Sequence, residues 1–514
     1  MWSFNNMDMK KYIACFFFVW CGISQFSCKK FLDVKPLDKL TGNNFYQNKE
    51  DVEAVINDMS RMMFDKFNET QFVGATGEYR SGEVKHEPAS DGGPIRRCVE
   101  IAGTNNLLEL MSNGTWNNTY HFERITQWMT YYKIIQAANI LVFKLNEGIP
   151  ALSAVETKQY LGEAKFARCL AYFFMVRLYG DVVYYTDAYH IEALPRESMV
   201  SVFNKCIADL KSNMNDMPWG FSDPAQKGVR ASRGSIIALI MNMNMWNAGF
   251  DGSNATKYWR ETAEMGDVLI KSNAYRLLPL TEWAVVARGR SDESLFELFR
   301  TVNYGDYVWP GAPISDMFIH FPYKQPQSRF QLSYAYYKAE YMQKIFPETD
   351  PDKRKDAWFQ NMYANTGEFL LLKVAMNKYT EGTEDNNPEN TFQIFRYADA
   401  ILLRAEALAN LNEDVDALTA LNMVRKRADA PNYIGTGQEL KDFIFNERSR
   451  ELFGEGVLYF DLIRTKRILT RTWTSNPLTL DQFNRGGWTW PIDGAARDNN
   501  PFMVLNTYWT NGGI

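Results

Sequence analysis

Residues 303–310, a stretch containing glycine and proline, place aromatic rings next to hydrogen-bonding side chains. The stretch reads Asn303-Tyr304-Gly305-Asp306-Tyr307-Val308-Trp309-Pro310. Flat aromatic rings stack on the apolar CH faces of sugars, while amide and carboxylate groups bind the hydroxyl groups at the edges of the sugar. This mixture in an irregular segment predicts a ligand-binding loop.

Further candidates for the same site lie just upstream and in an earlier loop region. Trp283 and Arg288 precede the stretch, and Tyr79 and Asp91 lie within residues 70–120. The predicted ligand-binding residues are Tyr79, Asp91, Trp283, Arg288, Asn303, Tyr304, Asp306, Tyr307 and Trp309. The alternative for Trp283 and Trp309 is structural, with each ring pinning the surrounding segment onto the helices.

A second group of candidates consists of charged residues near the C-terminus. Glu447, Arg448, Glu451, Asp461 and Arg464 lie at helical spacings. We expect them to form charge-assisted ion pairs that join the last helices, and not a catalytic or substrate-binding cluster. The same structural role is predicted for Arg168, Arg177, Arg396, Glu406, Arg425 and Arg427.

Motifs for catalysis, metals and cofactors are absent from the sequence. It contains no His-Glu-x-x-His, no Gly-x-Ser-x-Gly, no P-loop and no dinucleotide fingerprint, and its 4 histidines lack metal-ligand spacing. We therefore expect a protein that is not an enzyme and has no cofactor. The net charge of −5 gives no basic field for nucleic acid.

The first 28 residues resemble an export signal. Lys10 and Lys11 precede a short apolar run, residues 12–23, and Cys28 follows where the polar chain begins. We predict that residues 1–27 are a lipoprotein signal peptide, that Cys28 is the lipidated N-terminus and that residues 28–48 are a tether. The alternative is an ordinary signal peptide, with Cys28 incidental.

Residues 49–514 are expected to form one mostly helical domain. Apolar periodicity predicts helices at 49–67, 122–145, 155–179, 199–214, 232–246, 258–272, 396–412, 415–427 and 438–453. Residues 70–120 are predicted as loops. Residues 276–395 are predicted to form a large irregular insertion with short strands such as 294–299, between helical scaffolds at about 49–275 and 396–470.

Small residues at the expected helix contacts, such as Ala164 and Ala405, suggest tetratricopeptide-like helix pairs. Such pairs bury their apolar faces only by stacking on a neighbouring pair. Cys98, Cys169 and Cys206 are expected to be buried free thiols, with one disulfide bridge as the alternative.

Several ordered blocks of the chain resemble one family, the SusD/RagB nutrient-binding outer-membrane lipoproteins of Bacteroidetes. The blocks are residues 28–36, 162–168 with 176–182 (the latter reading VRLYGDV), 230–234, 395–408 with 421–428, 446–452 with 459–464, and 490–492 with 500–501. Together they extend over nearly the whole chain after residue 27.

This resemblance implies a mostly α, SusD-like fold and a role in nutrient binding. It also implies a lipid-anchored, surface-exposed protein of the outer membrane that captures a glycan or an oligopeptide for a TonB-dependent, SusC-like transporter. Two alternatives come from other classes of protein. One is an exported hydrolase of the same nutrient system, and the other is a purely structural tetratricopeptide adaptor.

Overall fold

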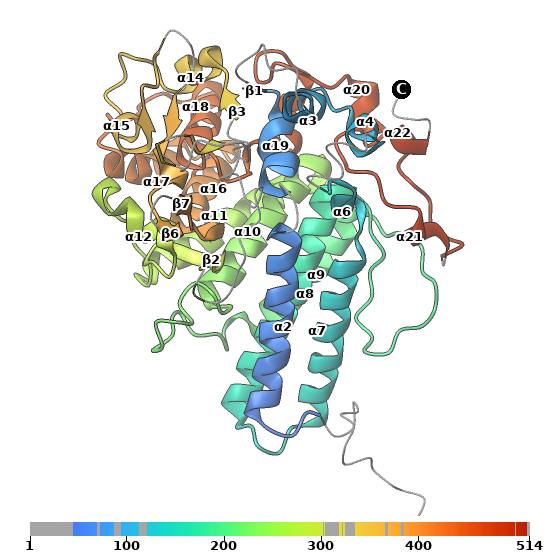
Figure 1. Cartoon of the computed structure of the whole chain (residues 1–514). Coiled ribbons are helices and arrows are strands. Elements are labelled where there is room, and N and C mark those ends of the chain that lie inside the picture. The colour runs from blue at the N-terminus through green and yellow to red at the C-terminus, as the bar shows by residue number, and fades with distance from the viewer. Residues whose placement is uncertain are drawn as a thin grey trace, which may run out of the picture.

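The computed structural model is a mostly helical molecule (Figure 1). It describes residues 45–68, 72–86, 94–112, 121–301, 303, 318–320, 322–323, 335–364, 369–381, 385–498 and 500–510. Its α-helices are α2 (Lys49–Asn68), α3 (Pro94–Gly103), α4 (Leu107–Ser112), α6 (Glu123–Thr126), α7 (Met129–Glu147), α8 (Ala154–Tyr179), α9 (Met199–Met214), α10 (Arg233–Phe250), α11 (Ala255–Lys271), α12 (Trp283–Arg288), α14 (Ala339–Ile345), α15 (Arg354–Trp358), α16 (Tyr397–Asn410), α17 (Asp414–Arg427), α18 (Gly437–Glu451), α19 (Leu458–Arg464), α20 (Leu480–Asn484), α21 (Ala495–Asp498) and α22 (Thr507–Thr510).

The strands are short and pair only two at a time. They are β1 (Val84–His86), β2 (Ser294–Leu298), β3 (Ala335–Tyr337), β4 (Phe359–Gln360), β5 (Leu370–Leu371), β6 (Lys378–Glu381), β7 (Asp385–Pro388) and β8 (Phe392–Arg396). The antiparallel pairs are β1–β3, β2–β8, β4–β5 and β6–β7. Short single-turn segments, η2 (Gly74–Glu78) and η3 (Tyr79–Ser81), precede β1.

Local sequence signals set both ends of the central helix α8. The Ser153 side chain accepts a hydrogen bond from the Glu156 amide, and the Glu156 carboxylate accepts one from the Ser153 amide. This reciprocal cap satisfies amide groups that have no partner inside the helix. At the other end Gly180 has a φ of +76°, which L side chains rarely adopt, and the helix stops there as the sequence predicts.

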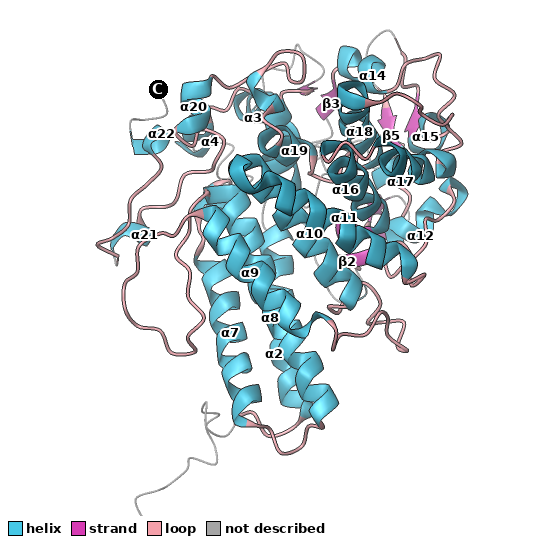
Figure 2. Ribbon diagram, turned by 180° about the vertical axis from the view of Figure 1, so that it is seen from behind, coloured by secondary structure: helices cyan, strands magenta, loops and turns pink. Residues whose placement is uncertain are grey.

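The helices pack as antiparallel pairs that stack on one another, as expected for tetratricopeptide-like units. Helix α7 packs on α8 and α8 on α9, while α10 packs on α11, α11 on α16, and α16 on α17 and α18. Figures 1 and 2 show the long helices α2, α7, α8 and α9 side by side at one end of the molecule. Close approach requires small residues, because a Cβ on Gly266 of α11 would lie 2.8 Å from the Arg404 Cβ of α16.

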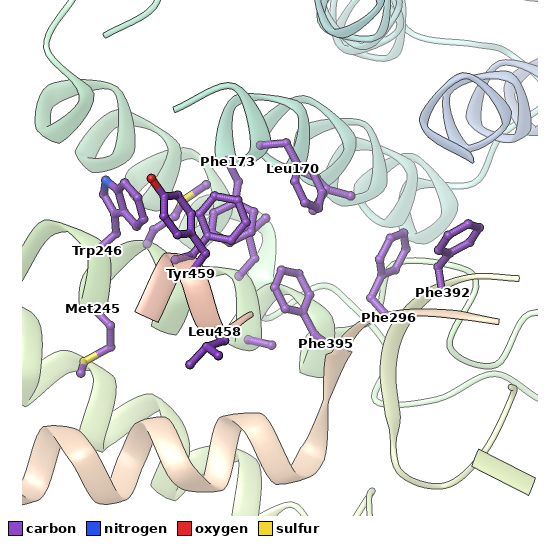
Figure 3. Close-up of a cluster of buried hydrophobic side chains, with 14 of the residues drawn as sticks. Leu170, Phe173, Met245, Trp246, Phe296, Phe392, Phe395, Leu458 and Tyr459 are labelled. Carbon is purple, nitrogen blue, oxygen red and sulfur yellow. The ribbon is translucent and has the colours of Figure 1, made fainter. Parts of the chain in front are cut away.

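Aromatic side chains pack between the helical scaffold and the insertion. Phe173 and Leu170 of α8 face Phe395 and Phe296 of the β8–β2 pair (Figure 3). The ring centroids of Phe173 and Phe395 are 5.8 Å apart, and all these side chains are buried. The insertion is therefore anchored in the main core by its own strands β2 and β8.

Two sequence predictions about secondary structure are wrong. Residues 70–120, predicted as loops, contain η2, η3, β1, α3 and α4, because Cys98, Val99, Leu107 and Leu110 supply a buried apolar face. The predicted single helix at 122–145 is broken between α6 and α7, where Gln127 takes an extended conformation.

Two further observations concern the thiols and the helices. Cys98, Cys169 and Cys206 are buried free thiols, which confirms the prediction for them. Across the part of the chain that the structure describes, no helix combines the length and apolar character that crossing a membrane requires.

Candidate ligand-binding site

The antiparallel β1–β3 pair brings the two predicted ligand-side regions together. Val84 pairs with Tyr337, and His86 pairs with Ala335. The chain leaves β1 after His86 toward residues 87–93, and it enters β3 from residues 324–334. Because paired antiparallel strands begin and end at the same edge, both connections depart from one end of this short ladder.

A pair of stacked rings lies one residue from that end, because Tyr336 pairs with Lys85 in the middle of the ladder. The imidazole of His320 and the phenol ring of Tyr336 are nearly parallel, with an interplanar angle of 4° and centroids 4.0 Å apart. His320 is buried, whereas Tyr336 is only partly buried. One face of the Tyr336 ring is thus held in place by His320 while part of the residue remains open to solvent.

The rings beneath the ladder form a packed support. Phe318 stacks on Tyr79, with centroids 5.8 Å apart, and on Tyr337, with centroids 5.0 Å apart. The Tyr337 hydroxyl donates to the carboxylate of Glu78 at 2.8 Å, and the Gly456 amide donates to the other carboxylate oxygen at 2.7 Å. Burial raises the pKa of Glu78 to about 7.

The structure contradicts the stacking role predicted for Trp283 and the ligand contact predicted for Tyr79, because both side chains are buried. The Trp283 Nε1 group donates to the Lys373 carbonyl at 3.0 Å, and its ring lies 4.7 Å from that of Trp358. Trp283 therefore has the structural role that was the alternative, since it pins α12 against α15. Tyr79 supports the ladder from below.

The remaining predicted site residues are distributed as follows. Arg288, at the end of α12, and Asn303 are exposed. Asp91, Tyr304, Asp306, Tyr307 and Trp309 lie outside the described residues, as does Cys28. Sequence reasoning missed Tyr336 and His320, although the aromatic run Tyr334-x-Tyr336-Tyr337 was a visible signal.

The predicted ion-pair block is confirmed, and it extends beyond the residues that were named. Arg354 of α15 contacts Asp352 and Glu447 at 2.6 Å and Glu451 at 3.0 Å, and all four side chains are fully buried. Glu447 also accepts from Arg425 at 2.9 Å. These cations hold the pKa of Glu447 at about 2, although burial alone would raise it.

A second buried cluster joins α16, α18 and α19. Arg448 contacts Asp399 and Asp461, each at 2.8 Å, and Arg464 contacts Glu406 at 2.5 Å and Asp461 at 2.8 Å. The predicted pairing of Arg168 and Arg396 is likewise present, with Asp209 and Glu293 among their respective partners. These clusters have the geometry of a scaffold, because each of these carboxylates is paired with at least one cation from the described residues.

The prediction is wrong for Arg177. Among the described residues, no carboxylate lies within ion-pair distance of its guanidinium group, which instead lies over the Phe460 ring, 3.6 Å from the centroid. Burial lowers the pKa of Arg177 to about 9.

A separate hollow of about 510 Å³ lies on the helical scaffold. Two half-buried rings, Trp259 of α11 and Trp473, contribute to its walls, together with polar side chains such as Gln438 and Asn410. This scaffold groove is a second place where rings and hydrogen-bonding groups meet.

The chain is similar to known proteins over almost all of its length. Two family models match, one described as "SusD family" over residues 290–509 and one as "Starch-binding associating with outer membrane" over residues 30–240. The crystal structure of a SusD homologue from Bacteroides thetaiotaomicron is 35% identical, with a TM-score of 0.80 over 90% of this chain and 99% of that one.

Two curated relatives give the same result at lower identity. SusD-like protein P38 of Formosa agariphila is 24% identical over 93% of this chain and 95% of its own length. The starch-binding protein SusD of Bacteroides thetaiotaomicron is 21% identical over 94% and 92%. With the helical fold and the ordered sequence blocks, these matches show that the chain belongs to the SusD/RagB family.

Proposed function

We propose that this protein captures a glycan at the outer end of the β1–β3 ladder. The observation that carries the proposal is the partly exposed residue Tyr336, stacked on His320 one residue from the point where both ligand-side connections leave the ladder. A ring that a neighbouring ring already holds in place suits stacking on a sugar, since little conformational freedom is lost on binding. The starch-binding relative and the family description support a carbohydrate ligand.

Binding without bond cleavage is the activity that the acidic groups favour. A glycosidase needs two carboxyl groups on either side of the scissile bond, one of them with a raised pKa. Burial raises the pKa of Glu78 and Glu297 to about 7, but both side chains lie in the interior, at 1% and 0% exposure. Neither of them can reach a polymer, so we do not favour the hydrolase alternative.

The proposed setting is the cell surface. Lipidation of Cys28 would anchor the chain in the outer membrane, and residues 28–48 would act as the tether. The stacked helix pairs would pack on a TonB-dependent, SusC-like transporter, leaving the ladder end free to receive the ligand. The export signal in the sequence and the family relationship support this arrangement.

The ligand class is tested by a combined glycan and peptide array on the lipid-free protein. We expect oligosaccharides to bind, and binding of oligopeptides alone would favour the peptide-binding alternative. Calorimetry with the array hit then locates the site. Tyr336→Ala is expected to weaken binding at least about tenfold, because hot-spot residues cost about 2 kcal/mol or more and 1.4 kcal/mol is one decade.

Two further variants complete the experiment. Trp309→Ala tests the predicted insertion loop, and we expect it to weaken binding as well. Trp259→Ala in the scaffold groove is the matched aromatic control and is expected to bind like the parent. Loss of binding in Trp259→Ala, with Tyr336→Ala unaffected, would place the site in the scaffold groove and refute the ladder-end proposal.

A further inference from the structure

A largely apolar cavity of about 120 Å³ lies between the end of α2, helices α8 and α12, and strand β8. Six phenylalanine rings contribute to its lining: Phe67, Phe72, Phe173, Phe174, Phe392 and Phe460. Phe173 and Phe392 are labelled in Figure 3. Asn390, Gln393 and Ile394 in the lining are partly exposed, so the cavity has a rim toward solvent.

Arg177 is the polar group that distinguishes this cavity. It lines the cavity with its guanidinium carbon 3.6 Å from the Phe460 centroid and 4.7 Å from the Phe173 centroid. A guanidinium group has five N–H donors, and here its central carbon lies over aromatic rings instead of beside an acceptor. Within the described chain, no acceptor takes a hydrogen bond from these groups, and the side chain keeps an intermediate exposure.

The other charged groups of the lining already have partners. The Lys373 ammonium group uses its three donors on the Glu451 and Phe453 carbonyls and on the Glu455 carboxylate. Glu455 also accepts two hydrogen bonds from Arg396. Lys373 and Glu455 cancel as charges, so the net charge of the lining is that of Arg177, and the nearby carboxylates of Asp461 and Asp399 act on it only from beyond ion-pair distance.

We propose that this cavity is a second ligand site, separate from the ladder end, and that it binds a small aromatic carboxylate. The N–H edge of Arg177 would hold the carboxylate in the paired, parallel geometry that guanidinium groups favour. The phenylalanine rings would surround the aromatic body, edge-to-face or offset. The volume is of the order that one ring needs, since a somewhat larger cavity of about 150 Å³ lined by similar side chains admits benzene.

The first test uses the unmodified protein and two probes of nearly equal shape. Benzoate and benzamide differ in charge, and we expect benzoate to bind with a Kd of about 1 mM or tighter in calorimetry. Benzamide is expected to bind at least about tenfold more weakly, because it cannot form the charged pair. Equal affinities for the two probes, or no saturation by benzoate, would overturn the proposal.

Substitutions of Arg177 then test whether benzoate binds in this cavity. Arg177→Met is expected to lose the preference for benzoate over benzamide, and Arg177→Lys to retain only part of it, because lysine keeps the charge without the planar fork. Ala287→Leu, which places a larger side chain in the cavity, should weaken the binding of both probes. Arg233→Met is the matched control, because Arg233 also lies on an aromatic ring, 4.9 Å from the Trp219 centroid, but outside the cavity lining.

The same variants distinguish binding at Arg177 from binding of benzoate at another place on the protein. If Arg177→Met proves unstable, the comparison of Arg177→Lys with the parent still measures the role of the fork. If both Arg177 variants prefer benzoate over benzamide as the parent does, benzoate binds elsewhere. If Arg233→Met loses this preference as fully as Arg177→Met does, the effect comes from the general charge of the protein. Either result would refute the proposed site.

Discussion

Arg354 is a buried cation that joins the insertion to the last long helix, and its removal should destabilise the protein strongly. It lies in α15, whereas two of its three carboxylate partners, Glu447 and Glu451, lie in α18. Its third partner, Asp352, precedes it by two residues, at 2.6 Å. Replacing Arg354 by methionine keeps an unbranched side chain but deletes the charge and five side-chain hydrogen bonds.

The expected loss of stability depends on which carboxylate keeps no ion-pair partner when Arg354 is replaced. Glu447 keeps Arg425 and Arg450, and Glu451 keeps Arg396 and Arg427. Asp352 loses the one ion-pair partner it has among the described residues, while its side chain stays fully buried. Breaking a buried pair in this way costs about 3–5 kcal/mol, and we expect the lower end for Arg354→Met, because two of the three carboxylates stay paired.

The assay is urea unfolding followed by tryptophan fluorescence, with the shift in midpoint compared between variants. Lys353→Met is the neighbouring control, because its side chain is 59% exposed and its pair with Asp356 is long, at 3.9 Å. We expect the control to change the free energy of unfolding by less than about 0.5 kcal/mol. Adding Asp352→Asn to Arg354→Met should recover part of the loss, because it removes the stranded charge.

The reasoning would be refuted if Arg354→Met were no less stable than Lys353→Met. It would also fail if Asp352→Asn made the Arg354→Met protein still less stable, since the stranded carboxylate would then not be the cause.

Three more predictions concern separate parts of the molecule. Burial raises the pKa of Glu78 to about 7, so the folded state binds this proton more tightly than the unfolded state, and the stability of the parent protein should fall as pH rises from about 4.5 to 7. Glu78→Gln should remove about 3 kcal/mol of that fall, at about 1.4 kcal/mol per pKa unit. Parallel profiles of urea midpoint against pH for the parent and the variant would contradict this prediction. Arg448→Ala should cost about 3–5 kcal/mol of stability with glycan affinity unchanged in calorimetry, whereas a stable variant that no longer binds would show a ligand role. Cys28→Ala should move the protein from the membrane to the soluble fraction and abolish lipid labelling, and unchanged fractionation would argue against the anchor.

The sequence alone predicted most of the long scaffold helices and the kinds of residue that stabilise them. Helix α8 lies within one residue of its predicted bounds, because its cap at Ser153 and its stop at Gly180 are local signals. The charges of α18 and α19 were correctly assigned to ion pairs, because their helical spacing puts them on defined faces. Family membership was also readable, because it depends on ordered blocks of sequence.

Only the tertiary structure decided which side chains meet and which are exposed. The partner of Glu447 in the insertion, Arg354, and the neighbour of Tyr336, His320, come from segments that no local spacing connects. Two single residues illustrate this. Trp283 was predicted to stack on a ligand, but its side chain is buried. Arg177 was predicted to form an ion pair, but its guanidinium group lies over the Phe460 ring instead. The physical reason is that burial and charge pairing depend on what distant segments place against a side chain, whereas helix formation depends mainly on neighbours within a few residues.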